Sequence, residues 1–133
     1  MADSKIPKDL AEKEVNAWLD FKRVKAKKRE ENESSIETLI DGFECGALSL
    51  NPETKELKLK LGFPIGDSQG ELVFKPRLKV GEAHKQLQGV SASNVDGRIL
   101  AYVSALTNTN SGVIKDMDTE DYTIAQSIAI FFF

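Results

Sequence analysis

Apolar residues recur at three- and four-residue intervals along the first part of the chain and then stop. The positions that share one helical face are Leu10, Ala11, Val15, Trp18, Leu19, Phe21 and Val24. Because neither glycine nor proline follows Pro7 in this segment, the spacing predicts a helix from Lys8 to about Asn32. The residues after Val24 are nearly all charged, so we expect a solvated helix end or a flexible hinge there.

A second, shorter helix is predicted to follow the charged stretch. Ser34 and Glu37 have the spacing of a capping box, in which each side chain satisfies a backbone N–H at a helix start. Apolar residues continue at helical spacing as far as Phe43, and Gly46 favours an end near Cys45. The pattern therefore indicates a new helix rather than a continuation of the first.

The apolar period changes to two in the middle of the chain. Apolar and polar residues alternate in the segments 47–50, 57–61 and 72–77, and turn-forming residues separate these segments at 51–54 and 66–70. Such alternation is typical of strands with one buried and one solvated face. Three strands joined by short turns predict an antiparallel meander.

Helical spacing returns in the last third. It predicts helices over Val80–Gln88 and Asp96–Leu106, a polar loop at 107–112, and a final helix that begins with Asp118 as its N-cap. The predicted fold class is therefore α+β, a small three-stranded antiparallel meander flanked by N-terminal and C-terminal helices.

Length and composition fit a globular protein of ordinary size. The chain has 133 residues, 41% of them hydrophobic and 29% charged. We expect an N-terminal helical arm with a charged end at 1–34 and an α+β domain at 35–133. One cysteine excludes an internal disulfide and suits a reducing compartment. The longest apolar run, Ile128–Phe133, is far shorter than the ~20 residues that span a bilayer, so we expect a cytoplasmic protein with no membrane partner.

Few residues suit catalysis or metal binding. His84, the only histidine, lies between charged neighbours with no partner in its segment to orient it. The acidic residues of 116–121 lack the layout of a calcium loop, and helix capping explains them. Glu44 disfavours a thiolate at Cys45, which we interpret as a buried structural thiol. We therefore expect no enzyme activity, no metal site and no cofactor.

A basic run is the strongest polar signal. Six residues carry it: Lys22, Arg23, Lys25, Lys27, Lys28 and Arg29. Such a surface could bind the phosphates of a nucleic acid. However, three glutamates come directly after the basic run, and the net charge of the chain is −3. The preferred interpretation is a solvated helix of mixed charge, and the second is a docking surface for an acidic protein. We do not expect nucleic acid as a principal partner.

The last six residues are apolar on every side. Neighbouring residues lie about 100° apart around a helix, so three consecutive phenylalanines cannot all face one core. We expect a partner protein or a second copy of the chain to cover part of this end, with wholly internal packing as the alternative. The predicted contact set is Ile124, Ile128, Phe131, Phe132 and Phe133.

The last two thirds of the chain resembles the tail assembly chaperones of long-tailed bacteriophages and prophages. The resemblance rests on the segments Leu57–Ile65, Phe74–Glu82, Leu106–Thr107, Val113–Tyr122 and Ile128–Phe131. Those chaperones have a similar order, in which a strand ends in an apolar-Pro-Ile turn and a basic strand leads into a short helix. A helix start with an Asp-Tyr pair and an aromatic end follow. The first ~35 residues lie outside the resemblance.

The resemblance implies a non-enzymatic role in the bacterial cytoplasm. Such chaperones bind the tape measure protein, whose long apolar helices would otherwise aggregate, and they help tail tube subunits to assemble around it. They are generally absent from the finished particle. The expected partners are therefore the tape measure protein and the tail tube protein, together with self-association.

Two other functions are compatible with the residues alone. One is a nucleic-acid-associated phage protein that uses the basic helix. The other is a virion component, such as a minor tail or tail-completion protein.

Overall fold

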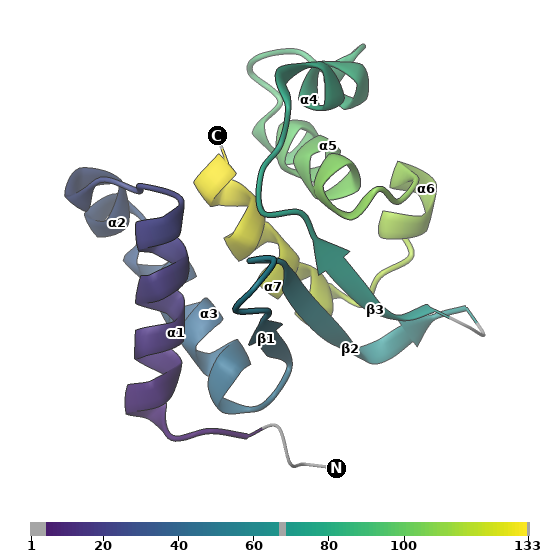
Figure 1. Cartoon of the computed structure of the whole chain (residues 1–133). Coiled ribbons are helices and arrows are strands. Elements are labelled where there is room, and N and C mark those ends of the chain that lie inside the picture. The colour runs from purple at the N-terminus through teal and green to yellow at the C-terminus, as the bar shows by residue number, and fades with distance from the viewer. Residues whose placement is uncertain (1–4, 67–68, 133) are drawn as a thin grey trace.

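The computed structural model describes residues 5–66 and 69–132. Helices from both ends of the chain surround one small sheet (Figure 1), which confirms the predicted α+β fold class. The elements are α1 (Lys8–Phe21), α2 (Ala26–Glu31), α3 (Glu33–Glu44), β1 (Leu48–Leu50), β2 (Leu57–Ile65), β3 (Gln69–Phe74), α4 (Val80–Leu87), α5 (Val95–Thr107), α6 (Ser111–Ile114), α7 (Thr119–Ala129) and the 3₁₀ helix η2 (Ile130–Phe132).

The sheet is the antiparallel meander that the alternating segments predict, in the order β1-β2-β3. Leu59 in β2 lies between Leu48 of β1 and Leu72 of β3, and all three side chains are buried. Lys58 and Lys60 flank Leu59 in β2 and are exposed. Because successive side chains in a strand point to opposite faces, the leucines form the inner face of the sheet and the lysines the outer one.

One hydrophobic core joins the two ends of the chain. α1 packs along α3, and α3 packs in turn on α7. Trp18 of α1 is 2% exposed and makes an edge-to-face contact with Phe131 of η2, with 6.0 Å between the ring centroids. The apolar face of α1, which the sequence assigned to an N-terminal arm, therefore belongs to the same buried cluster as the sheet.

The continuous first helix predicted from the sequence is wrong, because the structure divides it into α1 and α2. Arg23, between the two helices, has a left-handed φ of 59°. Arg29 of α2 holds the bend, since its guanidinium donates to the Val24 carbonyl at 2.9 Å and to the Asp20 carboxylate at 2.8 Å. The charged segment thus folds back on the end of α1 instead of extending it.

The boundaries of α3 correct two further predictions. Glu33 is its first residue and Asn32 its N-cap, so Ser34 lies inside the helix and forms no capping box. The helix ends at Glu44 with Cys45 as its C-cap, close to the predicted end, and Gly46 follows with a φ of 87°. Cys45 is exposed rather than buried, because it follows the last core residue of the helix and turns away with the chain.

The remaining helices follow their predicted bounds more closely. α4 and α5 each lie within one residue of the expected range at either end. The polar loop expected at 107–112 is shorter than predicted, because its last residues form the start of α6. Asn110 caps that short helix by accepting the Gly112 N–H at 2.7 Å.

Asp118 caps α7 as predicted, with its carboxylate accepting the Glu120 N–H at 3.0 Å. Asp121 in the same turn has an additional role. It is 6% exposed, and its two carboxylate oxygens accept the backbone N–H groups of Gly62 and Phe63 in β2, each at 3.0 Å. The pairing of β2 with β3 is irregular in this stretch, so α7 satisfies backbone groups that the sheet leaves free.

Candidate partner-binding groove

The five residues of the predicted C-terminal contact set have different environments. Ile128 and Phe131 are 0% and 4% exposed, whereas Ile124 and Phe132 are half-buried, and Phe133 lies outside the described residues. The two described phenylalanines face different ways because the chain passes from α7 into η2, which has about three residues per turn. Phe131 turns into the core, and Phe132 opens towards a groove.

This groove, which we call the α4 groove, has a volume of about 410 Å³. Its walls come from the end of α1, the segment between β3 and α4, α4 itself, α5 and η2. Figure 1 shows α4 next to α5, and the yellow end of the chain beside the segment that leads into α4. Leu87, Tyr102, Phe131 and Phe132 supply apolar lining. Such a volume falls within the range of ligand-binding sites.

Helix α4 leaves its apolar residues uncovered. No residue of the helix is buried. Val80 is 86% exposed, and Ala83 and Leu87 are half-buried on the groove side. A helix of a globular protein normally buries its apolar stripe. In the described part of this chain, α4 packs on α5, and its stripe remains open along the groove.

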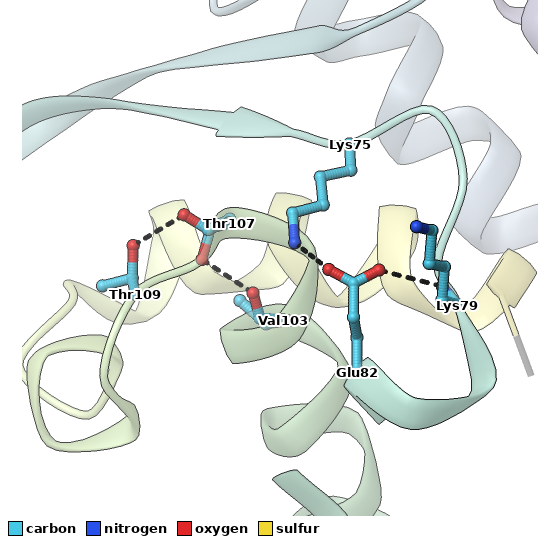
Figure 2. Close-up of polar contacts among 6 residues, drawn as sticks. All are labelled: Lys75, Lys79, Glu82, Val103, Thr107 and Thr109. Carbon is cyan, nitrogen blue, oxygen red and sulfur yellow. Dashed lines mark hydrogen bonds and ion pairs between the residues drawn. The ribbon is translucent and has the colours of Figure 1, made fainter. Parts of the chain in front are cut away.

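Glu82 fixes the start of α4 (Figure 2). One of its carboxylate oxygens accepts a hydrogen bond from the Lys79 backbone N–H at 3.0 Å, and the other accepts a hydrogen bond from the Lys75 ammonium group. The hydrogen bond from Lys75 is the largest cause of a pKa of the Glu82 carboxyl below its ordinary value. The ionised carboxylate therefore joins the helix to the chain that leaves β3.

Lys75 also connects this segment to α5. Its backbone N–H donates to the carbonyl of Leu106 at 3.0 Å. In the last turn of α5 the Thr107 hydroxyl donates to the Val103 carbonyl at 2.7 Å, and the Thr109 hydroxyl donates to the Thr107 carbonyl (Figure 2). β3, α4 and α5 are thus held together at one side of the groove.

Lys22 lies at the opposite wall, at the end of α1. Its ammonium nitrogen is 3.3 Å from the centroid of the Phe132 ring and 5.9 Å from that of Trp18. Burial, followed by the positive charges of Arg77 and Lys28, lowers the pKa of Lys22 from 10.5 to about 8. The cation therefore sits on aromatic rings in a partly desolvated place.

The other members of the predicted basic surface lie away from the groove. Arg29 is engaged by Asp20 and by a backbone carbonyl, and Lys28 is half-buried. Arg23, Lys25 and Lys27 are exposed on or beside α2. Of the six basic residues, Lys22 alone is found among the groove residues.

The described residues contain few groups that could serve in catalysis or metal binding. His84 is exposed at the groove and has no hydrogen bond to an orienting side chain within the described part. No group of three or more histidine, cysteine or acidic side chains in residues 5–66 and 69–132 is placed to hold a metal ion. None of the helices that the structure describes combines the length and apolar character needed to cross a membrane.

Most of the groove escaped prediction from the sequence. Val80 and Leu87 belong to α4, and Lys79 is its N-cap. The sequence pattern gives the position of this helix but not its exposure. One signal was present: the short apolar stripe of 80–87 follows two basic residues, Arg77 and Lys79. Which stripe is left uncovered depends on tertiary packing, and the sequence does not reveal that.

Comparison with protein-family models, with curated proteins and with solved structures gives no match.

Proposed function

We propose that this chain is a non-enzymatic assembly chaperone of the phage tail type. In this role the α4 groove holds an apolar helical segment of the tape measure protein until tail tube subunits assemble around it. The proposal joins the resemblance of residues 57–131 to tail assembly chaperones with the physical character of the groove. A chaperone of this kind needs open apolar surface and no catalytic centre.

The uncovered face of α4 is the observation that carries the proposal. Val80 is 86% exposed, although the other apolar groove-side residues of the same helix, Ala83 and Leu87, are half-buried. Phe132 and Leu87 continue this apolar surface into the groove. An apolar surface that the folded chain leaves in contact with water is a common mark of a protein-binding site.

An amphipathic helix is the partner shape that suits such a site. In helix-in-groove recognition the bound helix inserts apolar residues spaced by three or four positions. The groove volume of about 410 Å³ accommodates anchoring side chains, while the helix backbone remains above the surface. A tape measure protein, with long apolar helices, would present such segments repeatedly.

Binding of tape measure fragments by a pair of matched variants tests the proposal. Val80 and Val95 are both exposed and both occupy the first position of a helix. Val80→Asp should weaken co-purification with a tape measure fragment at least tenfold, because the charge enters the apolar surface. Val95→Asp should bind like the unaltered chain. Equal binding by both variants would refute the use of this groove.

The expected cytoplasmic, transient role separates the proposal from a virion component. Mass spectrometry of purified particles should find the tail tube and tape measure proteins without this chain. Its presence at stoichiometric level would favour the minor tail protein instead. A nucleic-acid role has less support, because Arg29 is already paired within the chain and the glutamates of α2 offset its lysines.

A further inference from the structure

The charged residues of the α4 groove have one sign. Lys22, Arg77 and Lys79 line it, and none of its described lining residues is acidic. This is unexpected in a chain whose net charge is −3. The apolar surface of the groove is therefore bordered by cationic side chains from two places, the end of α1 and the segment before α4.

Three basic residues elsewhere in the described chain have acidic partners. Arg29 pairs with Asp20 at 2.8 Å, Lys58 lies 3.8 Å from Glu71, and Lys75 pairs with Glu82. By contrast, no described carboxylate lies within ion-pair distance of the Lys22 or Arg77 side chain. Lys79 is nearer to an acidic group, since the Glu82 carboxylate accepts its backbone N–H and interacts with its charge. Lys22 and Arg77 instead contact aromatic rings, those of Phe132 and Phe21 respectively.

We propose that the segment bound in the α4 groove is an acidic amphipathic helix, with carboxylates beside its apolar face, and that Lys22 receives one of them. This inference rests on the proposed function and specifies its partner chemically. Charge complementarity is the reason for choosing this occupant: an acidic helix neutralises the basic border, whereas a basic helix or a second basic groove would be repelled.

Among the basic residues of the groove, Lys22 should bind a carboxylate of the partner helix most strongly. Its ammonium lies against Phe132, so a carboxylate that reaches it would be close to the apolar anchors of the same helix. The group is partly withdrawn from water, where a charge-assisted hydrogen bond is stronger than at the surface. Lys79 and Arg77 are exposed and would contribute longer-range attraction.

Three synthetic helices with one shared apolar face test the inference. The positions that flank this face carry glutamate in the first peptide, glutamine in the second and lysine in the third. Binding is followed by calorimetry and by the fluorescence of Trp18, the only tryptophan, which contacts both Phe131 and Phe132. The glutamate peptide should bind about tenfold more tightly than the glutamine peptide, and the lysine peptide least.

Variants show whether the preference comes from the groove. Lys22→Gln should reduce the glutamate-to-glutamine ratio of affinities to near one, and exposed Lys79→Gln should reduce it in part. Lys27→Gln, which removes the same charge from α2, should leave the ratio unchanged. Because Lys79 is exposed, its variant gives an answer even if Lys22→Gln folds poorly.

The outcomes separate this inference from the proposed function. If glutamate and glutamine peptides bind equally well, or if Lys22→Gln and Lys79→Gln leave the ratio intact, acidic recognition is overturned while an apolar groove remains. If no peptide binds but a tape measure fragment does, in a manner that Val80→Asp abolishes, the acidic preference is again wrong and the chaperone role stands. If neither fragment nor peptide binds, both proposals fall.

Discussion

Asp121 in α7 accepts the backbone N–H of Gly62 in β2 at 3.0 Å, across a separation of 59 residues in the chain. Its second oxygen accepts the N–H of Phe63 at the same distance. The carboxylate therefore fastens the C-terminal helix to an irregular stretch of the central strand. Asp121 is 6% exposed, and these two hydrogen bonds satisfy both of its carboxylate oxygens.

Asp121→Asn should lower the free energy of unfolding by about 1–3 kcal/mol. The amide oxygen can replace one acceptor, but the amide nitrogen would face the other N–H and leave it unsatisfied. Urea denaturation measures the loss. Asp116→Asn is the matched control, since Asp116 is exposed and should change stability little. A loss as large in the control would show that the hydrogen bonds to β2 are not responsible.

Lys22→Met should raise the free energy of unfolding by about 1 kcal/mol at pH 7, because it removes a partly buried charge whose cost is reduced by its remaining solvent contact. The pKa of Lys22 falls from 10.5 to about 8 on folding, so the folded chain binds fewer protons between these values. The stability of the unaltered chain should therefore rise with pH across that window.

The difference in unfolding free energy between Lys22→Met and the unaltered chain should become smaller from pH 7 to pH 9.5. Urea denaturation at each pH measures it. Lys27→Met serves as control, because Lys27 is exposed and its removal should give no such trend. A gap that stays constant with pH would mean that the ammonium of Lys22 is not desolvated in the folded chain.

Phe131→Ala and Phe132→Ala should differ although the residues are neighbours. Phe131 is 4% exposed and packs on Trp18, so its truncation should cost about 3–5 kcal/mol of unfolding free energy. Phe132 is half-buried, so its truncation should cost less and mainly weaken binding in the α4 groove. Thermal denaturation and fragment binding measure the two effects. Equal losses of stability would contradict the assignment of Phe131 to the core.

Glu82→Gln should loosen the start of α4. The carboxylate accepts hydrogen bonds from Lys75 and from the Lys79 backbone, and the neutral amide would weaken both. Hydrogen exchange of the α4 amides, corrected for intrinsic rates, should become faster. Glu71→Gln, which affects only the exposed ion pair with Lys58 on the sheet, should leave α4 unchanged.

The same contact should depend on pH in the unaltered chain. The pKa of Glu82 lies below the ordinary value of 4.5, so folding favours the ionised form. The stability that this contact gives to the start of α4 is fully present above pH 4.5 and is lost as the pH falls through the lowered pKa of Glu82. Protection of the α4 amides should be constant from pH 7 to 5 and fall below pH 4. Protection that declines already at pH 6 would point to another group.

Local patterns predicted the elements of this fold well, because each such pattern is set by neighbours in the chain. The leucines of β2 alternate with lysines, and Leu59 is buried between two other strands as expected. The charged stretch after Val24 indicated a helix end or a hinge, but the folded-back α2 was not predicted, because it depends on contacts that Arg29 makes with Val24 and Asp20. A left-handed residue at Arg23 carries no signal of its own, since arginine is not a residue typical of that conformation.

The candidate site was harder to predict than the fold. Its residues come from the end of α1, the start of α4, the middle of α5 and the last turn of the chain. No periodicity connects such distant positions. The apolar C-terminus did signal an unusual surface, but only packing distinguishes Phe131, which is buried, from Phe132, which lines the groove.

The contact between Trp18 and Phe131 has a consequence for biosynthesis. Trp18 and Phe131 are far apart in the chain, so the ring of Trp18 waits for this partner while the intervening residues are made. A chain that has not reached residue 131 can pack α1 on α3 but lacks this part of the core. Ribosome-bound chains that stop before residue 131 should therefore be more protease-sensitive at α1 than chains that extend past it.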